Sequence, residues 1–409
     1  MTEHSGQVDT VAKQVDVVVV GGGPSGATVA HDLARQGRSV VLLDRGGRIK
    51  PCGGAVPPIL LEEFDVPETQ LVARANCARM ISPKSMEVDM PINGFVGMVD
   101  REHFDEWLRE RARRAGAERV RGSFKSIEHD EQERTIVVYQ SKGDEPGAAK
   151  EEHRIIARLV IGADGARSEV ARQSIPGAEK IPFVAAYHEI VSSPPEGVKG
   201  FDGARCDVYY QGELSPDFYA WIFPHGSCTS VGVGTANKGF SMREAITKLR
   251  ERTGMSESET IRREGAPIPL KTLKRWDNGR DVLLAGDAAG CVAPSSGEGI
   301  YYAMLSGRLA AESADEFCRT NNPKALRLSR KRFMKAHGRV FWILGIMQRF
   351  WYTSDKRRER FVSICRDPDV QHLTWEAYMY KRLVKARPMA HIRIFFKDMA
   401  HLLGFAPVK

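Results

Sequence analysis

Hydrophobic positions near the N-terminus form two short runs separated by a helical pattern. Residues 15–20 read VDVVVV, residues 27–36 have apolar positions at helical spacing, and residues 39–43 form a second apolar run that ends at Asp44. Apolar, β-branched runs of this kind are typical of parallel strands buried on both faces. The pattern predicts a strand, a helix and a strand that together have the size of a mononucleotide-binding half-domain.

The following segments continue the alternation of helices and strands. Residues 101–115 form a strongly amphipathic helix capped by Asp100, and residues 158–161 form a further strand. Much later, residues 281–285 return to a nucleotide-type strand, and residues 298–318 form a long helix. These segments predict one α/β domain that is assembled from separated parts of the chain.

The middle and the end of the chain have a different character. Residues 181–235 are rich in Tyr, Phe, Val and Thr with short turns, which predicts an antiparallel sheet forming a separate substrate layer, while residues 323–403 look helical throughout. We therefore expect a mixed α/β fold with three parts: a discontinuous nucleotide-binding domain (14–175 and 265–320), a β-sheet substrate domain (176–264) and a basic helical C-terminal region (321–409).

Positive charge is concentrated at the C-terminal end. The chain has a formal net charge of +8, but residues 319–409 contain 21 Lys and Arg against 6 Asp and Glu, a local +15 that leaves −7 for the remainder. Such a region indicates either contact with an anionic partner or a solvated helical face. No nucleic-acid-binding motif accompanies the charge, so we expect no nucleic-acid partner.

Two apolar stripes run along the predicted C-terminal helices, each flanked by basic residues. Their members are Val340, Phe341, Leu344, Met347 and Trp351 in the first stripe, and Ile392, Phe395, Phe396, Met399, Leu402 and Leu403 in the second. Two interpretations remain open. The helices rest on the cytoplasmic face of an anionic photosynthetic membrane as a peripheral contact, or the stripes pack on the body of the protein.

Cysteine usage and the termini indicate a cytoplasmic protein. The seven cysteines are scattered, odd in number and form no CxxC pair, so a disulfide framework or a zinc site is poorly supported. The first fifteen residues are polar and lack the apolar core of a signal peptide. The apolar run 340–347 is too short to span a bilayer.

A glycine-rich turn, GGGPSG, joins the first strand to the first helix. Gly21 permits the tight turn, Gly23 lets the backbone approach a pyrophosphate, and Gly26 lets the helix pack closely on the strand. Asp44, at the end of the second strand, can accept hydrogen bonds from ribose hydroxyls. The predicted dinucleotide-binding residues of this unit are Gly21, Gly23, Ser25, Gly26, Asp44 and Arg45.

Two further motifs follow predicted strands. The first is GADGARS at residues 162–168, which alone fits a simple turn, and the second is GDAAG at residues 286–290, with PSSGEGI at 294–300 close behind. A strand-end Asp can bind ribityl hydroxyls, and small residues before a helix let a cofactor approach the helix N-terminus.

In this order and spacing, the three motifs resemble the flavoprotein superfamily of para-hydroxybenzoate hydroxylase. The resemblance implies a GR2-type Rossmann domain with a β-sheet substrate domain, and FAD in the first motif. It also implies that Arg101, which could otherwise be a surface residue, lies near the flavin. The further predicted cofactor-binding residues are Cys52, Gly53, Gly54, Arg101, Asp164, Gly165, Gly286, Asp287, Pro294, Gly297, Gly299 and Ile300.

Two segments resemble a narrower family. RIKPCGGAVP at residues 48–57 and PDFYAWIFP at 216–224 are similar to the cysteine motif and the PxxYxWxFP pattern of geranylgeranyl reductases, in the branch that makes the phytyl tail of chlorophylls and bacteriochlorophylls. The resemblance covers about residues 16–403. It implies stepwise reduction of three double bonds of a geranylgeranyl group, on (bacterio)chlorophyllide or as the free diphosphate. NADPH is the usual electron donor, although some relatives use ferredoxin.

An isolated trisubstituted alkene needs an acid, an apolar slot and aromatic faces near the developing positive charge. Cys52 is a candidate acid, or else a small buried hydrophobe. Tyr219, Trp221 and Phe223 alternate, so they share one face of a strand and can line an isoprenoid tunnel. The remaining predicted substrate residues are Pro224, which would end that strand, and Tyr187 and His188 on its neighbour; His188 is as well explained by a structural role.

Three alternatives remain. The chain could be an aromatic hydroxylase or halogenase of the same superfamily, or a reductase of archaeal-type membrane lipids. From another class, it could be a basic binding protein that carries flavin structurally. Oxygen-dependent hydroxylation, the choice of prenyl substrate and the absence of flavin reoxidation would separate them.

Overall fold

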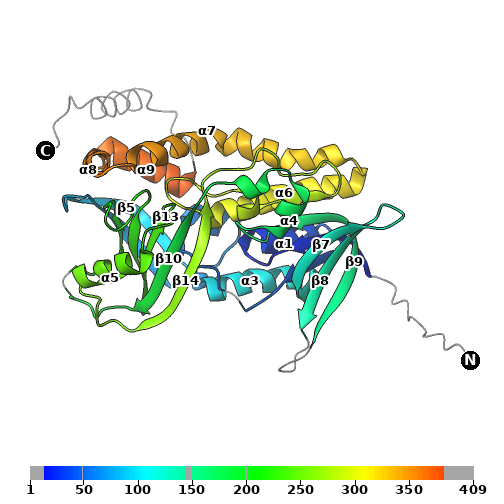
Figure 1. Ribbon diagram of the computed structural model, residues 1–409, viewed down its shortest axis with the longest axis horizontal. Coiled ribbons are helices and arrows are strands. Elements are labelled where there is room, and N and C mark those ends of the chain that lie inside the picture. Colours follow the sequence, from blue (N-terminus) through cyan, green and yellow to red (C-terminus); the bar gives the residue numbers. More distant parts are fainter. Residues whose placement is uncertain (1–12, 48, 143–148, 199, 382–409) are drawn as a thin grey trace, which may run out of the picture.

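The computed structural model describes residues 13–47, 49–142, 149–198 and 200–381. Its chain forms two sheets side by side, with helices between and above them (Figure 1). The first sheet has the order β6-β2-β1-β9-β8-β7, and β15 pairs with β9. Its strands are β1 (Lys13–Val20), β2 (Val40–Asp44), β6 (Glu118–Arg121), β7 (Ser123–His129), β8 (Thr135–Lys142), β9 (Lys150–Gly162) and β15 (Val282–Leu284).

The nucleotide-type half of this sheet is parallel. Strand β1 pairs in parallel with β2 and β9, and β15 pairs in parallel with β9, so the carboxyl ends of these strands meet at one edge. Val17, Val18 and Val19 are fully buried, as expected for a strand covered on both faces. Helices α1 (Pro24–Arg35), α3 (Arg101–Arg114) and α6 (Ile300–Thr320) lie beside it, and α1 packs against both others. The predicted Rossmann-type α/β domain is confirmed.

The second sheet is mostly antiparallel and has the order β14-β10-β13-β12-β11-β4-β5-β3. The exception is β11, which pairs with β4 in parallel. The strands of this second sheet are β3 (Ala55–Val56), β4 (Ala73–Ile81), β5 (Glu87–Met98), β10 (Phe183–Ser192), β11 (Arg205–Tyr209), β12 (Ala220–His225), β13 (Cys228–Thr235) and β14 (Thr260–Pro269). The sheet therefore draws strands from residues 55–98 as well as from the middle of the chain.

Shorter helices complete the two layers. Helix α5 (Met242–Arg252) packs on β13 and β10, α2 (Pro58–Glu63) lies near β5, and α4 (Glu169–Ser174) follows β9. The predicted cap of α3 is present, since the Asp100 carboxylate accepts a hydrogen bond of 2.8 Å from the backbone N–H of Glu102.

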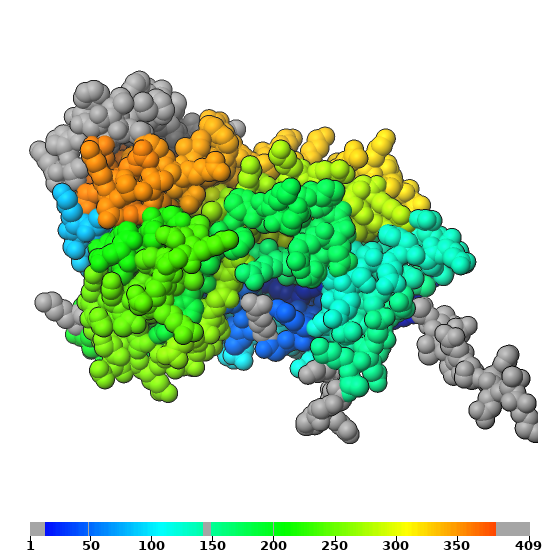
Figure 2. Space-filling view, in the orientation of Figure 1, coloured from blue at the N-terminus to red at the C-terminus, as the bar shows by residue number. Residues whose placement is uncertain are grey.

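The C-terminal region is helical over its described part, with α7 (Arg327–Trp351), α8 (Asp355–Ile364) and α9 (Pro368–Tyr380). Helix α7 packs along α6, and α8 and α9 contact β5, so this region covers one end of the second sheet (Figures 1 and 2). The stripe from Val340 to Trp351 faces the protein body: Phe341 and Trp351 are buried. The stripe from Ile392 to Leu403 lies outside the described residues. Within the described residues, no helix is long and apolar enough to cross a membrane.

Candidate functional site

The glycine-rich turn between β1 and α1 has the geometry that its sequence predicts. Gly21 adopts a φ of 105° and abuts Ala163, while a side chain at Gly26 would overlap the carbonyl oxygen of Gly21. A side chain at Gly23 would meet no atom within 4 Å. Gly23 also caps α1 without a side-chain hydrogen bond, so no cap side chain occupies the first turn of the helix. This arrangement suits a phosphate group.

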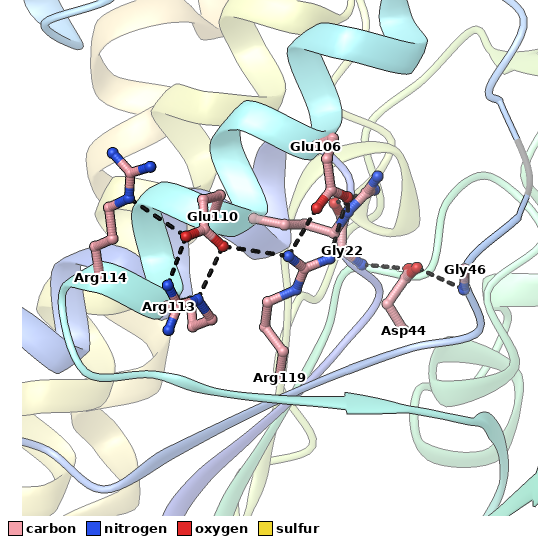
Figure 3. A network of polar contacts seen from close by, with 9 residues as sticks. Gly22, Asp44, Gly46, Glu106, Glu110, Arg113, Arg114 and Arg119 are labelled. Atoms are coloured by element: carbon pink, nitrogen blue, oxygen red, sulfur yellow. Dashed lines mark hydrogen bonds and ion pairs between the residues drawn. The ribbon is translucent and has the colours of Figure 1, made fainter. Parts of the chain in front are cut away.

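Asp44 holds the same turn from the end of β2 (Figure 3). Its two carboxylate oxygens accept hydrogen bonds of 2.7 Å from the Gly22 N–H and 2.8 Å from the Gly46 N–H. Arg109 of α3 donates to the Gly22 carbonyl, 3.2 Å away, and to Glu106. The acid predicted for ribose therefore lies at the turn and is fixed by two backbone groups, whereas the neighbouring Arg45 is exposed.

The carboxylate of Asp164 has hydrogen-bond partners close by in the chain, which the sequence did not predict. Its carboxylate accepts hydrogen bonds from the Ser168 hydroxyl at 2.5 Å and from the Glu169 N–H at 2.7 Å, at the start of α4. Burial raises the pKa of this carboxyl. The backbone of Asp164 nevertheless borders the first motif, because a side chain at Gly21 would lie 2.9 Å from the Asp164 Cα.

The third motif packs directly on the first. Gly286 has a φ of 64°, and a side chain there would lie 2.7 Å from the Cβ of Ser25. The Ser25 hydroxyl is buried and has no hydrogen-bond partner among the described residues. The Asp287 carboxylate lies 2.5 Å from the Lys50 ammonium group. The orphaned hydroxyl, the open backbone at Gly23 and the closely packed glycines fit a dinucleotide cofactor.

An apolar cavity of about 600 Å³ lies between the two sheets and the C-terminal helices. Residues of α7, α8 and α9, including Leu344, Met347 and Trp375, form part of its wall. Such a volume is within the usual range of small-molecule sites. The predicted residues that line it are Cys52, Gly53, Gly54, Arg101, Tyr187, His188, Tyr219, Trp221, Phe223, Asp287, Gly297, Gly299 and Ile300.

The other predicted residues are not among those that line the cavity. Gly21, Gly23, Ser25, Gly26, Asp44 and Arg45 lie at or near the first turn, and Asp164, Gly165, Gly286 and Pro294 belong to the second and third motifs. Pro224 pairs with Thr229 inside β12, which continues to His225. The prediction that Pro224 ends this strand is therefore wrong: the pairing of β12 with β11 covers only Ala220 to Ile222, so at Pro224 only the ladder to β13 remains and the missing N–H interrupts nothing on the β11 side.

The Cys52–Gly54 segment fits tightly against the aromatic strand. A side chain at Gly53 would lie 2.9 Å from the Phe223 ring, and Gly54 has a φ of 71°. The Cys52 sulfur accepts a hydrogen bond of 3.4 Å from the Gly54 N–H and lies within hydrogen-bond reach of the Arg101 side chain. Arg101 is buried and pairs with Asp105 through bonds of 2.7 and 2.6 Å, so it is no surface residue.

Three aromatic side chains form one row along the cavity. The ring centroids of Tyr219 and Trp221 are 5.9 Å apart, and those of Trp221 and Phe223 are 6.1 Å apart. The Trp221 indole N–H donates to the Ser230 hydroxyl at 3.1 Å, and burial raises the pKa of Tyr219. The predicted common face of these residues is present.

His188 is held by protein groups on both sides of its ring. Its Nδ1 lies 2.9 Å from the Ser230 hydroxyl, and its Nε2 lies 2.9 Å from the Glu264 carboxylate. Ser230 thus links His188 to Trp221. These contacts favour a structural role, although the ring also lines the cavity.

One buried ion pair at the cavity was missed by sequence reasoning. Lys381, which follows α9, contacts the carboxylate of Glu298 in the PSSGEGI segment. Glu298 lies within a motif that the sequence analysis had singled out, but nothing in the sequence indicates that Lys381 lies beside it.

Comparison with known proteins defines the family. Residues 84–310 match the FAD binding domain family, and residues 16–55 match the FAD dependent oxidoreductase family. The chain is 56% identical to the geranylgeranyl diphosphate reductase of Rhodobacter capsulatus, over 96% of this chain and 98% of that protein. It is 31% identical to the digeranylgeranylglycerophospholipid reductase of Methanocaldococcus jannaschii, over 75% of this chain and 78% of that protein.

A solved structure shares the fold. It is a geranylgeranyl bacteriochlorophyll reductase-like protein from Thermoplasma acidophilum, with a TM-score of 0.78, 22% identity and coverage of 93% of this chain and 100% of that protein. At this identity the likeness shows the fold alone. The extent of the matches to whole relatives shows that this chain belongs to the geranylgeranyl reductase family of FAD-dependent oxidoreductases.

Proposed function

We propose that the protein reduces a geranylgeranyl group to a phytyl group, saturating three double bonds in successive steps. The observation that carries the proposal is an apolar cavity around which the Cys52–Gly54 segment, the aromatic row and the PSSGEGI segment meet. An apolar enclosure suits a long isoprenoid chain, and it excludes water from the reacting carbons. The 56% identical relative bears the name of a geranylgeranyl diphosphate reductase, which supports the same substrate class.

The cofactor of this reaction is FAD, and we assign its binding to the three motifs. The ADP half is held by Gly21, Gly23, Ser25, Gly26, Asp44 and Arg45; the pyrophosphate and the ring are held by Asp164, Gly165, Gly286, Asp287, Pro294, Gly297, Gly299 and Ile300; and the ring is bordered by Cys52, Gly53, Gly54 and Arg101. When bound, reduced FAD supplies the hydride. The close-packed glycines leave room for the cofactor next to the backbone.

The aromatic row has two tasks in this proposal. The rings of Tyr219, Trp221 and Phe223 bound the slot for the prenyl chain, and their faces stabilise positive charge that develops at a tertiary carbon. Tyr187 lies at the same wall. Cys52 lines the cavity beside Arg101, where its thiol takes part in the reaction next to the flavin.

We further propose NADPH as the electron donor, with the acceptor carried either on (bacterio)chlorophyllide or as free geranylgeranyl diphosphate. Anaerobic incubation of the holoenzyme with NADPH and each acceptor, followed by mass spectrometry of the prenyl tail, tests this. Three successive gains of two hydrogens are expected. A parallel incubation contains reduced ferredoxin in place of NADPH. Oxygen-dependent NADPH consumption with hydroxylation of the product would contradict the proposal, and reduction of archaeal-type lipids alone would reassign the substrate.

We propose peripheral membrane contact through the outer face of α7. On this helix Trp342 and Ile346 are 67% and 47% exposed, one turn apart. Helix α7 has seven Lys and Arg and no acidic residue. Apolar anchors among basic residues suit an anionic headgroup layer, where prenylated substrates reside. Sedimentation with phosphatidylglycerol vesicles, but not with phosphatidylcholine vesicles, is expected. The double variant Trp342→Ala/Ile346→Ala should lose it.

A further inference from the structure

Glu298 and Lys381 form an ion pair that is almost fully buried. The Lys381 ammonium lies 2.5 Å from one carboxylate oxygen of Glu298 and also contacts the other. The two side chains are 3% and 5% exposed for Lys381 and Glu298 respectively. Burying such a pair removes two charges from water, and the mutual attraction rarely outweighs that cost by much. Stability alone therefore gives a weak reason for this pair.

The two members of the pair lie at different depths. Glu298 lines the cavity, whereas Lys381 is not among the described residues that line it. The Lys381 ammonium is instead surrounded by aromatic rings, with centroids at 5.1 Å for Tyr301, 5.3 Å for Tyr302 and 4.6 Å for Tyr378. The carboxyl group therefore has the cavity on one side and the ammonium on the other.

Saturation of an alkene needs a proton as well as a hydride, and most polar groups at the cavity are already engaged. The Tyr219 hydroxyl donates to the Ser296 carbonyl, both nitrogens of His188 have partners, and Arg101 is paired with Asp105. Burial raises the pKa of Glu298 and lowers that of Lys381. Both effects favour placing the shared proton on the carboxyl group.

We propose that Glu298 is the catalytic proton donor to the alkene and that Lys381 is a positioning residue that orients the carboxyl group and returns its proton. The inference rests on the proposed function. In the step, the O–H bond of Glu298 breaks and the alkene π electrons form a C–H bond at one carbon. The other carbon receives the hydride that reduced FAD supplies, and Glu298 is left as a carboxylate.

In this proposal the proton returns to the pair from its Lys381 side, away from the cavity. Tyr301, whose ring borders the Lys381 ammonium, donates a hydrogen bond of 3.0 Å to Glu63, and Glu63 is partly exposed. The charge of Glu63 also acts on Lys381. Each reduction consumes one proton, so successive reductions require this supply from solvent through the Lys381 side of the pair.

The test separates the two half-reactions of the FAD-loaded holoenzyme. In the Glu298→Gln variant, reduction of FAD by dithionite should proceed as in the parent protein, because it does not involve the alkene. Anaerobic reoxidation by the prenyl substrate should slow by about 100-fold or more, as expected for loss of a general acid. Reoxidation at the parent rate would overturn the proposal. A parent protein that reduces no prenyl substrate would instead refute the proposed function.

Lys381 variants supply a signature that a merely structural role would not produce. In Lys381→Met, a single turnover uses the proton already on Glu298, so it should slow far less than steady-state turnover, which needs reprotonation. Lys381→Arg keeps a positive charge beside Glu298, but a guanidinium group does not release its proton, so the steady-state rate should stay as low as that of Lys381→Met. Equal losses in single and repeated turnover would overturn the role of Lys381.

A readout independent of activity completes the test. The infrared spectrum of the parent protein should contain the band of a protonated carboxyl group that is missing from the spectrum of Glu298→Gln. The control variant Cys52→Ala should retain this band. Its absence would overturn the proposal.

Because removing one partner leaves an uncompensated buried charge, the double variant Glu298→Gln/Lys381→Met keeps the question answerable if a single variant loses FAD. Its reoxidation should be as slow as stated for Glu298→Gln, and a parent-like rate would again overturn the proposal.

Discussion

The hydroxyl group of Tyr219 donates a hydrogen bond of 2.5 Å to the backbone carbonyl of Ser296. The neighbouring carbonyl, of Ser295, accepts a bond of 3.1 Å from the Tyr352 hydroxyl at the end of α7. The loop before α6 is thus fixed from two sides, by the aromatic strand of the second sheet and by the C-terminal helices. The substrate wall and the segment assigned to FAD are therefore mechanically joined.

Tyr219→Phe should weaken FAD binding and lower stability. The ring can keep its stacking on Phe218, at 4.3 Å, but the carbonyl group of the exposed residue Ser296 loses its donor. The expected loss is about 0.5–1.5 kcal/mol of unfolding free energy. Urea denaturation and titration of FAD onto apoprotein measure the two effects. Tyr380→Phe, at an exposed position, is the matched control. A Tyr219→Phe variant equal to the parent in both measurements would show that the bond does not position the loop.

Trp221→Phe should retain FAD and slow prenyl reduction. Phenylalanine preserves an aromatic wall, but its face attracts a cation less strongly than that of tryptophan. A difference of about 1.4 kcal/mol at the transition state corresponds to a roughly tenfold slower rate. Anaerobic reoxidation of the reduced holoenzyme measures it, with exposed Trp342→Phe as the control. An unchanged rate would remove Trp221 from the chemistry and leave it as packing.

Cys52→Ala distinguishes a functional thiol from a small buried hydrophobe. Alanine is small enough to leave the close contact of Gly53 with Phe223 undisturbed. The variant should therefore still bind FAD, and the purified protein should remain yellow. The thiol beside Arg101 is lost, and the prenyl substrate should then be reduced more slowly, by about tenfold or more. The measurement is anaerobic turnover at equal FAD content. Parent-like turnover would show that Cys52 acts as packing only.

The strands and the first motif could be predicted because their signals are local. The β-branched run of β1 and the spacing of Gly21, Gly23 and Gly26 each determine one element or turn. Strand β5 was missed although its burial alternates from Glu87 to Ile92, because Pro91 and Gly94 interrupt the strand pattern of its sequence. The parallel pairing of β4 with the distant β11 could not be predicted either, because it leaves no local pattern.

The candidate site divides in the same way. The residues of the glycine-rich and cysteine motifs could be named because each carries its own sequence pattern. The backbone of Asp164 borders the glycine-rich turn, as its place in the second motif predicts, but the partner of its carboxylate at the start of α4 could not be predicted. Lys381 could not be found, since its contact with Glu298 depends on how α9 docks more than eighty residues later.

Gly54→Ala should be among the most destabilising single changes in the site. Gly54 has a φ of 71°, and an added Cβ would lie 2.6 Å from the Val99 carbonyl oxygen and overlap the His225 ring. Gly197 has a φ of 86° with open space around it, so Gly197→Ala carries the backbone strain without the clash. The control should lose about 1–2 kcal/mol, and Gly54→Ala a further ~1–3 kcal/mol. Equal losses in urea denaturation would show that the segment shifts freely.

His337 should make the stability of the protein fall in acid. Its side chain is only 9% exposed and packs on the rings of Tyr302 and Phe333. Burial, reinforced by the Lys381 ammonium, lowers its pKa from 6.5 to about 4. A histidine whose folded pKa lies below its unfolded pKa contributes its stability above the unfolded value. That contribution is lost as the pH falls, because the unfolded chain takes up the proton first.

The expected window for this loss runs from pH 6.5 down to about 4, and the shift corresponds to about 3 kcal/mol at most. His337→Gln removes the titrating group, so its unfolding free energy should change less with pH in this window than that of the parent. Urea denaturation at closely spaced pH values measures both curves. His103→Gln, at an exposed position, controls for the loss of a histidine. If His337→Gln kept the full acid dependence of the parent, the destabilisation would have to come from the carboxyl groups instead.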